Sequence, residues 1–329
     1  MFRILHDTKF DFIKWWKLTT VLTVIWTAIG LGFLAVHGIR YSIEFTGGTL
    51  IQLQFKQAPR IDDIRAVVDG AGYQGSEIAQ FGASTEYTVR AAPHGNAEHA
   101  SADSTSKIIE TALKQRYGDN VSVVRSEFVG PRVGAELRTK AMIAVLISFA
   151  VTLVYLAIRF EWRFGLAAVV ATAHDVLTTI AFLAMLRLEV SLTVVAAILT
   201  VIGYSLNDTI IIYDRVRENL KKQRNESLRD VMNRSVNETL PRSVLTHATT
   251  LAATLALLIF AGEVIRPFAW VMTFGIFTGT FSSIYVATAL LLWIERKWPR
   301  PTGAERKGAA RAVAEERRQR RTNDVVASR

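Results

Sequence analysis

The chain of 329 residues contains no cysteine, so it can form neither disulfide bonds nor thiolate metal sites. It also lacks a Walker phosphate-binding loop, a glycine-rich dinucleotide fingerprint, a nucleophile elbow and a spaced set of metal ligands. The pair Gly47-Gly48 is too short to cradle a phosphate and predicts a turn before a strand. These absences argue against an enzyme, a cofactor or a resident metal. They leave the cellular compartment open.

Apolar sequence is abundant and makes up 50% of the residues. It forms long runs instead of amphipathic stripes, which is typical of membrane-spanning helices. The first run follows Lys14 and Lys17 and is longer than the apolar part of a signal peptide, so we interpret it as an uncleaved span. The six predicted spans are residues 18–36, 141–158, 164–186, 191–213, 242–261 and 268–294.

The formal net charge of +10 is compatible with nucleic-acid binding, but the distribution of the charge points elsewhere. Basic residues concentrate in the connection 214–241, the short turn 159–163 and the tail 299–329, which the positive-inside rule assigns to the cytoplasm. With six spans, both ends of the chain are then cytoplasmic. The tail has too few large apolar residues to form a core, and we expect it to be disordered or a surface helix.

Residues 38–137 contain no spanning run and predict a separate domain on the outer side of the membrane. Residues 49–55 alternate apolar and polar side chains, as a half-buried strand does. The predicted order of strand, helix, strand, strand, helix, strand is that of a ferredoxin-like α+β fold, in which two helices cover one face of a sheet. The further elements are a helix at 61–68, strands at 77–81 and 87–91, a loop at 93–103, a helix at 104–117 and a strand at 121–124. The predicted division is a cytoplasmic end at 1–17, a helix at 18–37, the outer domain at 38–137, five helices at 138–298 and the tail at 299–329.

One acidic residue, Asp208, lies about 9 Å inside the cytoplasmic boundary of the fourth span, at a rise of 1.5 Å per residue. An ionised group near the centre of a span costs at least about 2.5 kcal/mol, so its presence needs an explanation. Arg242 begins the fifth span. Because the cytoplasmic ends of spans four and five are expected to be antiparallel neighbours, the two side chains could pair. Polar residues nearby are Asn207, Thr209, Ser243, Thr246, His247, Thr249 and Thr250.

This set has three interpretations. A carboxylate that switches between a paired and a protonated state can carry a proton, and a polar lining suits a proton path through a helix bundle. The pair could instead be a static link between two helices, or Arg242 could simply extend to the cytoplasmic surface. We favour the proton path. The predicted relay residues are Asp208, Arg242, Asn207, Thr246, Thr249 and Thr250.

A second polar site, His174-Asp175, lies in the third span. Histidine titrates near neutrality, so a relay role is possible. The two side chains point about 100° apart on a helix and do not both face the same partner, so we favour a structural, hydrogen-bonded role. The same alternatives apply to His247. Gly275 and Gly279 form a GxxxG pair that permits close helix packing in the sixth span.

Several strings, in this order and at these spacings, together resemble the SecD/SecF family. They are DF at 11–12, EFTGGT at 44–49, VGPRVGAEL at 129–137, FEWRF at 160–164, AHDV at 173–176, GYSLNDT at 203–209 and DRVREN at 214–219. The resemblance covers residues 8 to 298. His247 departs from the family, which commonly has a small or hydroxyl residue at that place.

The resemblance implies one six-span half of an RND-type transporter in the bacterial inner membrane. Such a half pairs with SecD, joins the SecYEG channel, with YajC as a further partner, and uses the proton motive force to complete the export of a preprotein. In the family, an aspartate and an arginine that match Asp208 and Arg242 are essential for proton flow, and its threonines match Thr246, Thr249 and Thr250. The alternatives are an RND-type lipid or drug exporter half and a purely structural membrane scaffold. The small outer domain and the six spans favour the translocase.

Overall fold

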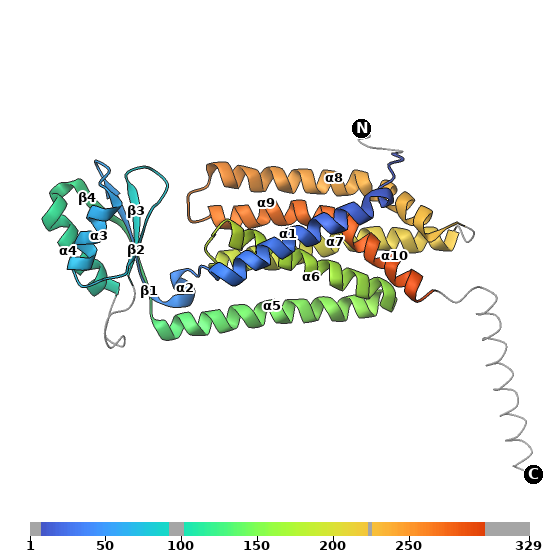
Figure 1. Cartoon of the computed structure of the whole chain (residues 1–329), viewed down its shortest axis with the longest axis horizontal. Helices are drawn as coiled ribbons and strands as arrows, with labels where there is room; N and C mark the ends of the chain where they lie inside the picture. The colour runs from blue at the N-terminus through green and yellow to red at the C-terminus, as the bar shows by residue number, and fades with distance from the viewer. Residues whose placement is uncertain (1–7, 92–101, 223–225, 300–329) are drawn as a thin grey trace, which may run out of the picture.

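The computed structural model describes residues 8–91, 102–222 and 226–299. The predicted loop at 93–103, apart from its last two residues, lies outside these ranges. The predicted tail at 299–329, apart from its first residue, also lies outside them. The described part consists of a long helix bundle with a small αβ domain at one end (Figure 1).

Six helical segments in the described ranges are long and apolar enough to cross a membrane. The start of α1 and the end of α10 both lie at the end of the bundle away from the αβ domain (Figure 1). This arrangement, together with the sheet described below, confirms the predicted fold class. The segments are α1 (Trp16–His37) with the short η1 (Ile13–Trp15) before it, α5 (Pro131–Arg159), α6 (Trp162–Met185), α7 (Leu192–Lys222), α8 (Leu228–Phe260), and α9 (Arg266–Phe281) continued by η3 (Ser282–Ala287) and α10 (Thr288–Lys297).

The αβ domain contains an antiparallel four-stranded sheet in the order β2-β3-β1-β4. This is the ferredoxin-like order that the sequence predicts. The central strand alternates between buried and half-buried side chains, and its buried Ile51 and Leu53 pack with Ile64 of one helix and Ile109 of the other. The elements are β1 (Gly48–Phe55), α3 (Ile61–Gly70), β2 (Glu77–Gln80), β3 (Glu86–Ala91), α4 (Ala102–Tyr117), η2 (Gly118–Asn120) and β4 (Val121–Val129).

The two connections between this domain and the membrane part meet at one point. A short helix, α2 (Ile43–Thr46), ends at Gly47, which has φ 74°, a conformation that favours glycine. A Cβ atom on Gly47 would lie 2.8 Å from the Cα atom of Pro131, and one on Gly134 would lie 2.9 Å from the nitrogen of Gly47. Only glycine allows this approach. Gly47 therefore forms the predicted turn and also packs against the start of α5.

The cytoplasmic connection predicted at 214–241 is mostly helical. Helix α7 continues to Lys222, and α8 begins at Leu228, where the hydroxyl of Ser227 accepts a hydrogen bond from the Asp230 amide at 3.2 Å. Pro241 lies inside α8 instead of preceding a helix. The hydropathy of a sequence shows where a helix enters the hydrocarbon of the membrane, whereas capping residues determine where the helix itself begins. The predicted start at Arg242 is based on hydropathy alone.

The predicted close packing at Gly275 and Gly279 occurs between α9 and α7. A Cβ atom on Gly275 would lie 2.3 Å from a methyl carbon of Val201, and one on Gly279 would lie 3.0 Å from the Cβ atom of Ser205. The six residues that follow α9 form a π-helix, η3, a distortion often found at functional sites. This packing places η3 against the polar part of α7.

Candidate functional site

Asp208 lies on the inward face of α7, and only 3% of the residue is exposed. The hydroxyl of Ser243, on α8, donates a hydrogen bond to its Oδ1 atom at 2.5 Å. Its Oδ2 atom is buried and has no hydrogen-bond partner within the described ranges. A carboxylate with one paired and one open oxygen has room to accept a proton on the open oxygen.

Arg242 does not form the predicted ion pair with Asp208 in the described part of the chain. Successive side chains on a helix point about 100° apart, so the turn of α8 that directs Ser243 inward directs Arg242 outward. The arginine is exposed and lines a surface pocket together with Asp214, Glu218 and Glu238.

His247 lies one turn beyond Ser243 on the same inward face of α8 and is 8% exposed. Its ring packs edge-on against the ring of Tyr204, with centroids 5.2 Å apart. The Nδ1 atom of the imidazole is buried and lacks a partner in the ranges that the structure covers. Asp208, Ser243 and His247 therefore form a line of buried polar groups between α7 and α8, with two atoms left open.

The remaining predicted relay residues lie on the outward face of the same two helices. Asn207, Thr246 and Thr249 are exposed. The two threonines donate to backbone carbonyl groups one turn earlier, Thr246 to Arg242 at 2.9 Å and Thr249 to Leu245 at 3.1 Å. The Tyr204 hydroxyl links α7 to α8. It lies 2.8 Å from the Thr250 hydroxyl and donates to the Thr246 carbonyl at 3.0 Å.

His174 and Asp175 contact each other, which the sequence does not predict, and their further partners differ. The Nδ1 atom of His174 lies 3.1 Å from Oδ1 of Asp175, and the Ser205 hydroxyl donates to Oδ2. On its other side, the His174 ring reaches the Thr23 hydroxyl of α1 at 2.7 Å. Asp175 is 1% exposed and both of its oxygens are hydrogen-bonded.

This cluster extends beyond the residues that the sequence singles out. The hydroxyls of Thr27 and Thr178 lie 2.9 Å apart, and those of Thr209 and Ser283 lie 2.8 Å apart. Ser283 also donates to the Ser205 carbonyl at 3.3 Å, which links the cluster to η3. A sequence signal existed: Thr23 and Thr27, like His174 and Thr178, are spaced i, i+4 in apolar spans and share a helix face.

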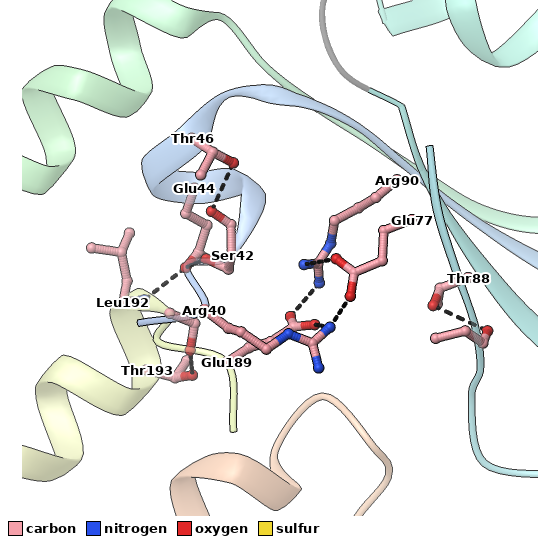
Figure 2. Close-up of polar contacts among 12 residues, drawn as sticks. Arg40, Ser42, Glu44, Thr46, Glu77, Thr88, Arg90, Glu189, Leu192 and Thr193 are labelled. Atoms are coloured by element: carbon pink, nitrogen blue, oxygen red, sulfur yellow. Dashed lines mark hydrogen bonds and ion pairs between the residues drawn. The ribbon is translucent and has the colours of Figure 1, made fainter. Parts of the chain in front are cut away.

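A separate group of charges joins the αβ domain to the membrane part (Figure 2). Arg40 follows α1, Glu77 and Arg90 belong to β2 and β3, and Glu189 lies in the turn between α6 and α7. We call these four residues the junction cluster. Arg40 pairs with Glu77, Arg90 pairs with Glu189, and the two cross pairs measure 3.8 Å and 3.5 Å. The side chains remain 19% to 48% exposed, so solvent weakens each pair.

Two family models match the sequence. The model described as protein export membrane protein SecD/SecF, C-terminal, matches residues 108–297. The model described as the SecD/SecF GG motif matches residues 32–59. Together they cover both sides of the junction at Gly47 and the buried polar groups described above, apart from Thr23 and Thr27 on α1.

Curated relatives include the protein translocase subunit SecF of Gemmatimonas aurantiaca, 56% identical over the whole length of both chains. The protein of the same name from Vibrio alginolyticus is 39% identical over 94% of this chain and 98% of its own. Among solved structures, SecDF of Thermus thermophilus, a translocon-associated membrane protein, superposes with a TM-score of 0.80 at 36% identity. The match covers 90% of this chain, but this chain spans only 40% of the SecDF chain.

Proposed function

Because the chain belongs to the SecD/SecF family of protein export membrane proteins, we propose that it is an accessory subunit of the bacterial Sec translocase. In this role it uses the proton motive force to complete the export of preproteins across the inner membrane. The observation that carries the energetic part is the buried Asp208, with one oxygen hydrogen-bonded and the other open. A carboxylate in that state can bind and release a proton without rearranging the helices around it.

The proposed path follows the contact between α7 and α8. Arg242 stands at its cytoplasmic mouth beside Asp214 and Glu238. Ser243 and His247 line the interior. Asn207 and the three threonines, Thr246, Thr249 and Thr250, supply hydroxyl and amide groups that can hold water on the outward face.

That outward face also supports a second six-span partner. Asn207, Arg242, Thr246 and Thr249 are exposed on α7 and α8, although polar groups at membrane depth normally face a bundle interior. The solved SecDF chains are much longer than this chain, which spans 40% of them. We therefore assign this face to SecD, so that the path runs between the two halves.

The remaining partners follow from the same role. With both termini in the cytoplasm, the αβ domain lies in the periplasm, where an emerging preprotein is accessible. The assembled unit joins the SecYEG channel and YajC in the lipid bilayer. The relatives bear the name of a translocase subunit and one of them matches over its full length, so a lipid or drug exporter half is not favoured.

The test replaces Asp208 with Asn in the full chain, co-expressed with SecD. This change keeps the shape of the side chain and removes the ionisable group. We expect the proton flux in proteoliposomes and the late phase of preprotein export to fall at least about tenfold. The matched control is Asp230→Asn, at the start of α8, because Asp230 is exposed, accepts a hydrogen bond from the Ser227 hydroxyl at 2.6 Å and lies outside the proposed path. Unchanged flux and export in the Asp208 variant would favour the structural scaffold.

A further inference from the structure

An apolar pocket opens at the end of the bundle that carries the αβ domain, away from the proposed proton path. It has a volume of about 150 Å³ and lies between α5 and the ends of α1, α6 and α7. Helix α5 is on the opposite side of the bundle from α8 (Figure 1), so the pocket does not face the proposed SecD surface. Its apolar lining includes Leu34, Met142, Val145, Ile180, Leu183 and Ile198.

The pocket is bounded by basic side chains. Arg40 is paired within the junction cluster, but Arg138 and Arg187 have no carboxylate partner in the described ranges. Arg138 is exposed, and its guanidinium carbon lies 4.7 Å from the ring centroid of Tyr41. Arg187 is also exposed and donates only to the His37 carbonyl, at 3.2 Å. Each guanidinium keeps N–H groups free for an anion.

The position of the two arginines relative to the membrane limits which kind of anion the pocket can bind. Arg187 follows the last turn of α6, and Arg138 lies two turns into α5, so both are at the boundary between hydrocarbon and water. Tyr41 beside them is a residue type enriched at this boundary. A ligand that meets both the guanidinium groups and the apolar interior must carry a negative head and a hydrocarbon chain. A cavity of about 150 Å³ holds a molecule the size of benzene, or about six carbons of a chain.

We propose that this pocket binds one anionic phospholipid of the leaflet on the side of the αβ domain. Its phosphate lies between Arg138 and Arg187, and the upper part of one acyl chain enters the space below Tyr41. Two opposed arginines suit the oxygens of a phosphodiester, and the apolar walls require no polar partner. The lipid is a resident ligand and not a transported substrate. The proposal is independent of proton coupling.

The backbone segments that cover the pocket connect the proposed lipid site to the αβ domain. The Ser42 amide donates to the Val190 carbonyl at 3.0 Å, and the Val190 amide donates to the Arg40 carbonyl at 2.8 Å. These short bridges connect the end of α1 to the turn that carries Glu189. A lipid held beneath them stabilises the same segment to which the junction cluster attaches the αβ domain.

The test measures phospholipid bound to the purified full chain by native mass spectrometry, with dioleoyl phosphatidylglycerol titrated against dioleoyl phosphatidylcholine. A basic side chain near a membrane surface contributes a factor of about five in affinity, so Arg138→Gln and Arg187→Gln each lower the preference for phosphatidylglycerol roughly fivefold. Arg187→Lys keeps the charge and most of the preference. The matched control, Arg132→Gln, removes the same charge from the same helix outside the pocket and leaves the preference unchanged. Equal losses in the control and in the pocket variants would overturn the proposal.

Two further experiments separate the contribution of the lipid headgroup from that of its acyl chain. Ala141→Phe fills the apolar part without touching either arginine, and we expect it to lower binding of both lipids by a similar factor. Soluble glycerol phosphate competes weakly if the chain contributes, whereas competition as strong as that of the lipid means an anion site alone and contradicts the proposal. A photo-reactive group at Met142, in native membranes, should label phospholipid. Labelling of a protein subunit instead would show that a helix fills the pocket.

Discussion

Two buried carboxylates lie on neighbouring helices, Asp175 on α6 and Asp208 on α7, and their surroundings differ. Both oxygens of Asp175 are hydrogen-bonded, one to His174 and the other to Ser205. Asp208 has one partner, Ser243, and an open oxygen. This difference fits the proposed function, in which the fully hydrogen-bonded Asp175 holds helices together and the incompletely bonded Asp208 binds and releases protons.

Asp175 and Asp208 are expected to differ most in how much each contributes to the free energy of unfolding. Asp175→Ala leaves the Ser205 hydroxyl and the His174 ring without their shared partner, and each unsatisfied buried group costs about 1–3 kcal/mol. We expect a loss of about 3 kcal/mol, measured by equilibrium unfolding in bicelles. Asp214→Ala, which removes an exposed carboxylate, should cost less than about 1 kcal/mol. A loss in the Asp175 variant no larger than in this control would show that the cluster does not order the bundle.

A smaller effect is expected when only the donor is removed. Ser205→Ala deletes the hydroxyl that donates to Asp175 and keeps the Cβ atom that packs against Gly279. We expect a loss of about 1 kcal/mol, in the range of interhelical hydrogen bonds in model peptides. Combining it with Asp175→Ala should add little, because both changes break the same bond. Additive losses would mean that the two residues act separately.

A residue at the edge of the buried polar cluster around His174 and Asp175 should contribute still less to the free energy of unfolding. Thr23→Val keeps the shape of the side chain and removes its 2.7 Å contact with the His174 ring. A hydrogen bond between membrane helices averages about 0.6 kcal/mol, and we expect a loss of that size in the same unfolding measurement. Thr19→Val is a control on the same helix, because the Thr19 hydroxyl donates to the backbone carbonyls of Trp15 and Trp16 one turn earlier, both at 3.0 Å. Equal losses in the two variants would place Thr23 outside the cluster.

Asp208→Asn should have the smallest effect on stability and the largest on function. The amide keeps a partner in Ser243, and the open oxygen of the wild type makes no bond that can be lost. We expect the unfolding free energy to change by no more than about 0.6 kcal/mol while proton flux is lost. A destabilisation as large as that of Asp175→Ala would remove the distinction between the two carboxylates.

The sequence predicted most of the fold because the fold depends on periodicities that are visible in it. Alternation in residues 49–55 predicted β1, and the long apolar runs predicted the spans. Helix ends were less predictable. Hydropathy placed the fifth span at Arg242, whereas the cap at Ser227 starts α8 about four turns earlier.

Less of the site could be predicted. The burial of Asp208 followed from the apolar sequence around it, but its partner depended on which way one helix turns. A shift of a single residue, about 100°, exchanges Arg242 for Ser243. The contact between Thr23 and His174 spans 151 residues and depends on the packing of α1 against α6, which no local pattern records. The GG string at 47–48 and the string beginning at 129 were recognisable separately, yet only the structure shows that they touch.

The meeting of Gly47 with Pro131 and Gly134 has a mechanical consequence. Both chain crossings reach the αβ domain through β1 and β4, which are adjacent strands, and both pass this single point. Any tilt of the αβ domain must therefore be a rotation about this point. The ion pairs of the junction cluster lie to one side of that point and join the domain to the membrane part there. A small rotation at the glycines becomes a larger displacement at the far end of the domain.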